Sequence, residues 1–110
     1  MEYLFSYGTL RDPAVQRETF GCEVAGEPDA LVGYRLEDMS ISDPAVVALS
    51  GSSVHPVAVP SADPSDRVPG HVFALTPEQL ARADAYESAD YRRIGVSLAS
   101  GLAAWLYVKD

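Results

Sequence analysis

The sequence predicts a small α+β domain in which a mixed or antiparallel, barrel-like sheet carries two packed helices. The chain holds eight glycines and eight prolines among 110 residues, so the apolar segments between them are short, as is typical of strands. Only two segments carry helix-capping signals, which leaves too few crossover helices for an open parallel sheet. The length is that of one domain, and we treat residues 1–110 as a single unit.

The N-terminal part is predicted to form a strand, a turn and a helix. Aromatic residues alternate with others over residues 2–7, which favours a strand, and residues 8–10 follow as a turn. Asp12 is a favourable N-cap, and Pro13 suits the first helical position. Gly21 is expected to end this helix.

The clearest helix signal in the chain lies just after residue 75. Thr76 is a good N-cap, Pro77 fits the first helical position, and Gln79 completes a capping box. We expect this helix to run to about Glu87 or Ser88.

The remaining segments with strand character are bounded by glycine, proline and small polar residues. They are residues 30–36, 46–49, 54–59, 70–75, 91–98 and 102–108. Pro56 and Pro60 favour a sheet edge for the strand at 54–59, and residues 61–66 are expected to be a loop. The last two strands are expected to form a hairpin through residues 99–101.

Charge and composition exclude several classes of function. The net charge of -8 repels phosphate backbones and anionic lipids, so we expect neither a nucleic-acid nor a membrane partner. No apolar run approaches the ~20 residues that span a bilayer. The first residues lack the pattern of a signal peptide, so the sequence predicts a cytoplasmic protein.

Metal and nucleophile chemistry find little support in the sequence. Cys22 is the only cysteine, which excludes an internal disulfide and a cysteine-based zinc site, and we expect it to be a small buried apolar residue. His55 and His71 form no metal-binding pattern with nearby acidic residues. No serine lies in a nucleophile-elbow context, and no dinucleotide or P-loop fingerprint is present.

Two carboxylates fall on the inward face of the second predicted helix. The spacing i, i+3, i+4, i+7 places four residues on one stripe: Leu80, Ala83, Asp84 and Glu87. Burial raises the pKa of a carboxylate towards the range that suits acid/base catalysis. Glu87 could instead meet solvent at the helix end, and Asp84 could pair with Arg92, Arg93 or a backbone N–H.

Two further segments could bind an anion. At the tetrapeptide Tyr7-Gly8-Thr9-Leu10 a strand leads into a helix, and its glycine lets successive N–H groups converge, although an ordinary tight turn is the alternative. Tyr91 and Arg93 share one face of a predicted strand, where a guanidinium could hold a carboxylate or simply face solvent.

Five segments, taken together in their order and spacing, resemble the γ-glutamylcyclotransferase-like, or AIG2-like, family. They are Tyr7-Gly8-Thr9-Leu10, residues 30–36 (ALVGYRL), residues 68–73 (VPGHVF), the pattern L-x-x-x-D-x-[YF]-E…Y-x-R within residues 80–93, and residues 104–108 (AWLYV). The fourth pattern contains Asp84, Tyr86, Glu87, Tyr91 and Arg93. The tetrapeptide alone is weak evidence, but the ordered set spans nearly the whole chain.

The resemblance implies a mixed α+β barrel whose members release 5-oxoproline from γ-glutamyl compounds without a metal or cofactor. It implies that Glu87 is the acid/base residue and that the glutamyl group of a small-molecule substrate lies against Tyr7, Gly8, Thr9 and Leu10. We add Tyr91 and Arg93 as expected substrate-binding residues. The alternatives are a non-catalytic binding module on the same fold and a different lyase or amidase, and the leaving group cannot be read from the sequence.

Overall fold

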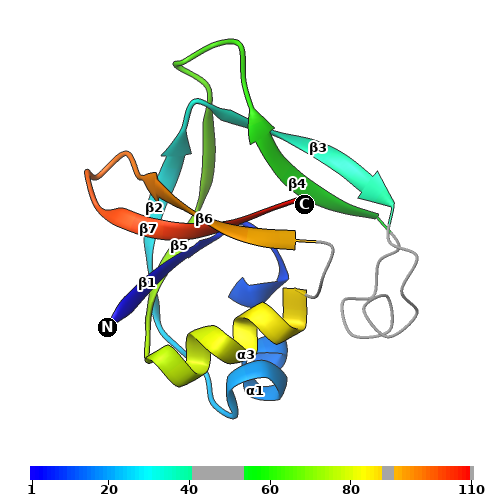
Figure 1. Ribbon diagram of the computed structural model, residues 1–110, viewed down its shortest axis with the longest axis vertical. Coiled ribbons are helices and arrows are strands. Elements are labelled where there is room, and N and C mark those ends of the chain that lie inside the picture. The colour runs from blue at the N-terminus through cyan, green and yellow to red at the C-terminus, as the bar shows by residue number, and fades with distance from the viewer. Residues whose placement is uncertain (41–53, 88–90, 110) are drawn as a thin grey trace.

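The computed structural model describes residues 1–40, 54–87 and 91–109. Along the chain the elements are β1 (Glu2–Ser6), the 3-10 turn η1 (Thr9–Arg11), α1 (Pro13–Phe20), β2 (Gly26–Val32), β3 (Tyr34–Ser40), β4 (Val54–Pro60), β5 (Arg67–Leu75), α3 (Pro77–Glu87), β6 (Tyr91–Ser97) and β7 (Ala103–Lys109). The two helices lie together on one side of the strands (Figure 1). The predicted α+β class is confirmed.

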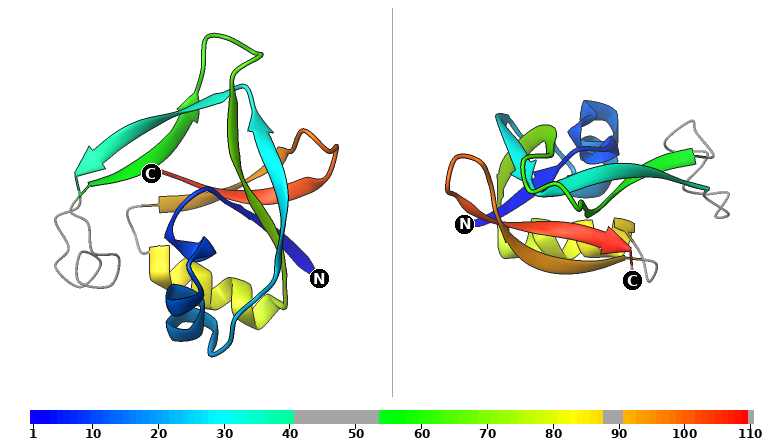
Figure 2. Two further views of the ribbon diagram at one scale, coloured as in Figure 1. Left: turned by 180° about the vertical axis from the view of Figure 1, so that it is seen from behind. Right: turned by 90° about the horizontal axis from the view of Figure 1, so that it is seen from above.

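The strands form two sheets and do not close into a barrel, which corrects the barrel-like prediction. Five strands pair in the order β2-β5-β1-β7-β6, and the ribbon β3–β4 is a separate sheet that extends away from the helices (Figures 1 and 2). Among the strands of the described residues, only β1 and β7 pair in parallel. The sheet edges touch at one bridge, Leu31–Leu98, beside the hydrogen bond from Ala99 N to Ala30 O at 2.8 Å. The β3–β4 ribbon pairs with neither edge of this seam among the described residues.

Gly33 divides the strand that the sequence predicts over residues 30–36. Its φ of 79° lies in the left-handed region, which glycine adopts without a steric penalty. The chain turns there from β2 into β3, and Gly33 N donates to Asp66 O at 2.7 Å. The predicted edge position of residues 54–59 is confirmed, since β4 pairs only with β3 among the described strands. The strand predicted at 46–49 lies outside the described residues.

Both helices are capped as the sequence predicts. Asp12 Oδ1 accepts a hydrogen bond from Ala14 N at 2.8 Å, and α1 ends at Gly21, whose φ is 77°. In α3, Gln79 N donates to Thr76 Oγ1 at 3.1 Å and Thr76 N donates to Gln79 Oε1 at 2.9 Å, which is a complete capping box. Within the described ranges, neither helix has the length and apolarity that crossing a membrane requires.

Successive side chains along a strand point to opposite faces of the sheet, and an apolar cluster lies on each face of the five-stranded sheet. Leu4 of β1 packs on the helix side with Leu80 and Ala83 of α3, and both helix residues are buried. Phe5, the next residue of β1, packs on the opposite side with Leu31. The inward stripe of α3 is therefore held against the sheet, which fixes the direction in which the end of the helix faces.

Cys22 is exposed, so the prediction of a buried cysteine was wrong. It follows Gly21, the residue at which the chain leaves α1 on the surface. Gln79 Nε2 lies 3.8 Å from its sulfur, in an exposed contact between the two helices.

Candidate active site

Glu87 occupies the last position of α3 and is partly buried. Burial raises the pKa of its carboxyl from 4.5 to about 7. Among the described residues, no side chain or backbone group forms a hydrogen bond or ion pair with this carboxylate. A carboxyl in such surroundings changes its protonation state close to neutral pH, which is the property that acid/base catalysis requires.

Three tyrosines from different parts of the chain surround the end of α3. Burial is the main cause that raises the pKa of Tyr7, Tyr86 and Tyr107, and the negative charge of Glu87 raises the pKa of each further. Tyr7 directly follows β1 and Tyr107 lies on β7. The structure therefore brings Glu87 together with the end of β1 and the middle of the sheet.

The loop Tyr7–Leu10 is tied to the same end of α3. Thr9 Oγ1 and the Tyr86 hydroxyl are 2.6 Å apart, and Tyr86 is the residue next to Glu87. Gly8 N donates to Ser6 Oγ at 3.3 Å, and a Cβ atom at position 8 would meet no atom within 4 Å. There is therefore open space beside the loop at Gly8.

The backbone N–H groups of this loop divide into two kinds. Arg11 N bonds to Gly8 O at 3.2 Å, as the turn η1 requires. The N–H groups of Thr9 and Leu10 find no acceptor among the described residues. The first N–H groups of a helical turn have no partner inside the turn, so these two can donate to a bound anion.

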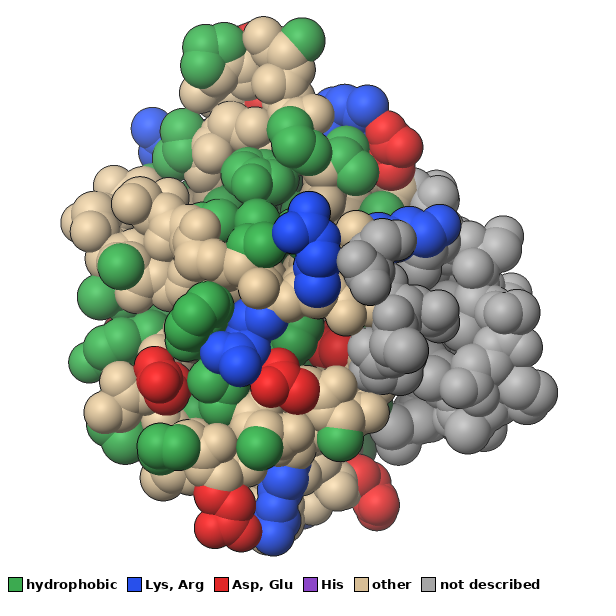
Figure 3. Space-filling view, in the orientation of Figure 1, with side chains coloured by type: hydrophobic (Ala, Val, Ile, Leu, Met, Phe, Trp, Pro, Cys, Tyr) green, Lys and Arg blue, Asp and Glu red, His purple; other side chains and the backbone are tan. Residues whose placement is uncertain are grey.

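Asp84 lies one helical turn before Glu87 and joins α3 to two strands. Arg93 of β6 donates to both carboxylate oxygens of Asp84, from Nε at 2.9 Å and from Nη2 at 3.1 Å. The Tyr107 hydroxyl donates to Asp84 Oδ1 at 2.6 Å. In the space-filling view, acidic and basic side chains are interleaved over the strip between α3 and β6 (Figure 3). Of the partners that the sequence left open for Asp84, the structure selects Arg93.

Arg93 and Tyr91 lie near this cluster but differ in their surroundings. The guanidinium of Arg93 stacks over the ring of Trp105, 4.4 Å from its centroid, and two of its nitrogens are used by Asp84. Tyr91 is half-buried and packs against the helix-side core.

Sequence reasoning missed Tyr107 and Trp105 as members of the site. The alternation of β7 places both on one face of the strand, and this was the signal available. The sequence could not tell which face of that strand meets α3.

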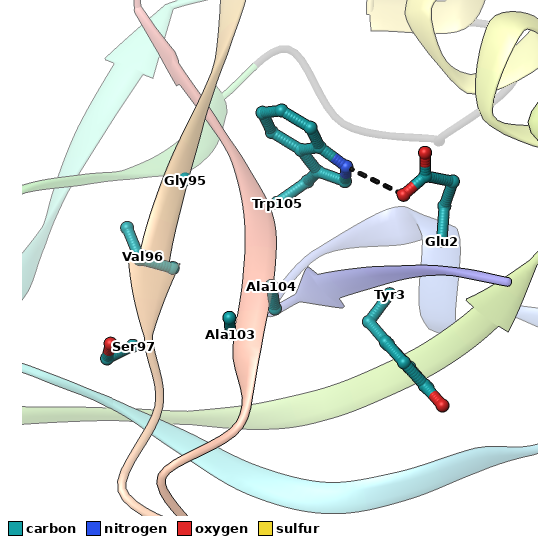
Figure 4. Close-up of a pocket in the computed structure, with 8 residues that line it drawn as sticks. All are labelled: Glu2, Tyr3, Gly95, Val96, Ser97, Ala103, Ala104 and Trp105. Carbon is teal, nitrogen blue, oxygen red and sulfur yellow. Dashed lines mark hydrogen bonds between the residues drawn. The ribbon is translucent and has the colours of Figure 1, made fainter.

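A shallow groove of about 470 Å³ opens at β1, β6 and β7, away from Glu87. Its lining consists of Glu2, Tyr3, Gly95, Val96, Ser97, Ala103, Ala104 and Trp105. Trp105 points toward Glu2, and its Nε1 donates to Glu2 Oε2 at 3.3 Å (Figure 4). Because Glu87 and the Tyr7–Leu10 loop do not line this groove, we place the candidate active site at Glu87 and not here.

The fold and the site define a class of protein: a small α+β domain in which a partly buried carboxyl of raised pKa lies beside a loop at the end of its first strand. The sequence profile of the family described as "Gamma-glutamyl cyclotransferase, AIG2-like" matches residues 4–110. The chain belongs to this family. No match to a curated protein sequence was found.

Solved structures share this fold at low sequence identity. One is a solution structure from Arabidopsis thaliana, 24% identical with a TM-score of 0.73, covering 98% of this chain and 61% of that one. Another, described as a gamma-glutamyl cyclotransferase, is 16% identical with a TM-score of 0.74, covering 99% of this chain and 66% of that one. An uncharacterized human protein is 18% identical with a TM-score of 0.71 at 99% and 66% coverage. The chain thus spans less than two thirds of the length of these three proteins.

Proposed function

We propose that this protein is a γ-glutamylcyclotransferase that releases 5-oxoproline from a γ-glutamyl amine or peptide. The observation that carries the proposal is the partly buried carboxyl of Glu87, whose pKa burial raises to about 7, beside the Tyr7–Leu10 loop. Family membership supports the same reaction class.

The substrate's glutamyl group would bind against the Tyr7–Leu10 loop. The N–H groups of Thr9 and Leu10, which have no acceptor among the described residues, would donate to its α-carboxylate or to the oxyanion that forms during the reaction. We retain Tyr91 and Arg93 as substrate-binding residues in this proposal. Arg93 would act through Nη1, since its other two nitrogens donate to Asp84.

The chemistry requires one group that first accepts and then returns a proton. Ionised Glu87 removes a proton from the substrate's α-ammonium group, and the free amine attacks the γ-carbonyl carbon. A carbon–nitrogen bond forms within a five-membered ring, and the tetrahedral oxyanion then collapses. The carbon–nitrogen bond to the leaving group breaks as protonated Glu87 gives its proton to the leaving nitrogen. The ring nitrogen, which still carries two hydrogens and a positive charge, then loses one proton to the ionised Glu87 carboxylate. This second proton passes to the released amine, which leaves as an ammonium ion, and Glu87 is ionised again. Because the attack is intramolecular, the site gains rate chiefly by folding the substrate into position.

Neither a metal nor a cofactor takes part in the proposed reaction, and the expected partner remains a small γ-glutamyl molecule. The described residues include no group of three or more His, Cys, Asp or Glu side chains placed to hold a metal ion. A cytoplasmic location stays a prediction from the sequence.

Incubation with a panel of γ-glutamyl amines, γ-glutamyl amino acids and γ-glutamyl-lysine isopeptides, followed by mass spectrometry of 5-oxoproline, tests the proposal. We expect release from at least one compound class and its loss in Glu87→Gln. Glu78→Gln is the matched control, because Glu78 lies on the same helix, is 77% exposed and pairs with Arg82. Binding of a γ-glutamyl compound without any 5-oxoproline release would favour a non-catalytic binding module.

A further inference from the structure

We propose that Asp84 is the positioning residue of this site: by holding Arg93 and Tyr107 at the same time, it fixes the last turn of α3 and thereby the carboxylate of Glu87. The inference rests on the proposed role of Glu87. It assigns to Asp84 a task beyond a general contribution to stability.

The contacts form a continuous chain from the surface groove to the site. Trp105 Nε1 bonds to Glu2, Arg93 stacks on the Trp105 ring, and Arg93 holds both oxygens of Asp84. Tyr107 completes the chain at Asp84 Oδ1. These residues come from β1, β7, β6 and α3. Asp84 therefore joins the helix directly to β6 and β7, and it is connected to β1 through Arg93 and Trp105.

The contacts of Asp84 can affect Glu87 because Asp84 lies in the turn of α3 that carries Glu87. Three residues of α-helix advance by ~4.5 Å, so Asp84 is one turn from the helix end. Terminal turns fray because their last carbonyl groups have no partner within the helix. A bidentate pair and a hydroxyl donor at Asp84 oppose fraying in the turn that carries Glu87. The Glu78–Arg82 pair, at the other end of α3 and open to solvent, has no such connection to the sheet.

The charged and titratable groups around Glu87 come from several elements of the fold. Tyr86 and Asp84 belong to α3, Tyr7 follows β1, Arg93 lies on β6, and Tyr107 lies on β7. Asp12, the N-cap of α1, contributes a charge that acts on Tyr86. Burial is the cause of the raised pKa of Glu87, so a looser helix end that admits water should lower that pKa.

The test is an NMR titration of the Glu87 side-chain carboxyl in the whole protein, with Glu87→Gln identifying the signal. The variant is Asp84→Asn/Arg93→Gln, which removes the ion pair and its bidentate geometry and leaves the net charge unchanged. We expect the pKa of Glu87 to fall by roughly one unit towards its ordinary value, because hydration favours the charged form. The matched control, Glu78→Gln/Arg82→Gln, removes an ion pair from the same helix and should leave the pKa of Glu87 unchanged.

Arg93→Lys keeps the inference testable if the double variant does not fold. Lysine keeps the charge but cannot make the bidentate contact, so an intermediate fall in the pKa of Glu87 is expected. An unchanged or raised pKa of Glu87 in the folded variants would overturn the inference. The titration needs no turnover. A lowered pKa in a protein that releases no 5-oxoproline therefore keeps this inference and rejects the proposed function.

Discussion

The two ion pairs that involve α3 have similar chemistry in different surroundings. Glu78 and Arg82 are 3.1 Å apart, and their side chains are 77% and 52% exposed. Arg93 makes two hydrogen bonds to Asp84, its side chain is 26% exposed, and Tyr107 adds a third contact. Solvent screens the outer pair, whereas bidentate geometry and neighbouring groups fix the inner one.

This difference indicates which carboxylate on α3 is suited to acid/base catalysis. The outer carboxylate of Glu78 has a partner and full access to water. The inner face holds one carboxylate with three hydrogen bonds, Asp84, and one with none among the described residues, Glu87. Asp84 is therefore fixed by its partners, whereas the pKa of Glu87 is set by burial.

The largest expected effect is the difference in catalytic activity between a substitution on the inner face of α3 and one on its outer face. Glu87→Gln should reduce 5-oxoproline release by ~100-fold or more, because the amide cannot exchange the proton. Glu78→Gln should retain wild-type turnover. Steady-state rates for both variants, with circular dichroism spectra to confirm folding, decide the point. Full activity in Glu87→Gln would remove Glu87 from the mechanism.

The free energy of unfolding as a function of pH should also distinguish position 87 from position 78. Here Glu87→Gln should be favourable, whereas its effect on activity is unfavourable. The folded-state pKa of Glu87, about 7, lies above its ordinary value of 4.5, so between these pH values the folded state holds a proton that the unfolded state has lost. Wild-type stability therefore falls as pH rises through this window. At pH 8 Glu87→Gln should be more stable than the wild type by on the order of 2 kcal/mol, a figure reduced for the solvent access that Glu87 keeps.

Urea denaturation at pH 4 and at pH 8 measures this difference. The gain in Glu87→Gln should vanish at pH 4, where both side chains are neutral. Glu78→Gln should show no comparable gain at pH 8. Equal stability of wild type and Glu87→Gln at pH 8 would mean that burial does not raise the pKa of Glu87.

Removal of one cation from each pair compares the pairs directly. Arg93→Ala should lower the free energy of unfolding by about 1.5 kcal/mol, because it leaves Asp84 without its bidentate donor. Arg82→Ala should cost less than about 0.5 kcal/mol, as is usual for an exposed i, i+4 pair. Urea denaturation of both variants gives the two values, and equal values would contradict the contrast.

The smallest effect concerns the start of α3. Thr76→Ala removes the N-cap and should cost about 1 kcal/mol of folding stability. Because the first turn lies far along the helix from Glu87, turnover should stay within about twofold of wild type. A large loss of turnover in folded Thr76→Ala would show that the position of Glu87 depends on the whole helix and not on its last turn.

The sequence was sufficient to predict those features that depend on residues close together along the chain. The caps at Asp12 and Thr76 are local, so the starts of both helices could be predicted. The inward position of Asp84 and Glu87 followed from helical periodicity alone. The division at Gly33 was missed because a glycine inside an apolar run can also continue a strand, and the contact that decides is with the distant Asp66.

The partners within the site could not be predicted because they depend on strand register. Arg92 and Arg93 were equal candidates for Asp84, and the pairing of β6 with β7 places Arg93 opposite Tyr107. The separation of the β3–β4 ribbon from the five-stranded sheet likewise depends on contacts between distant segments, which no local signal specifies. Cys22 was misplaced because the average burial of cysteine does not apply directly after a helix end.

The pairing of β1 with β7 also determines the order in which the molecule can assemble. Leu4 lies beside Trp105, so the central strand of the five-stranded sheet needs a neighbour from the opposite end of the sequence. The loop between β1 and β7 is long, and closing it costs conformational entropy before the contacts between the two strands can compensate. We therefore expect slow folding for a chain of this size. On a ribosome, Trp105 and Tyr107 are synthesised after α3 and long after β1. The support for Glu87 therefore arises only once β7 has been made, and the nascent chain cannot carry a complete site before then.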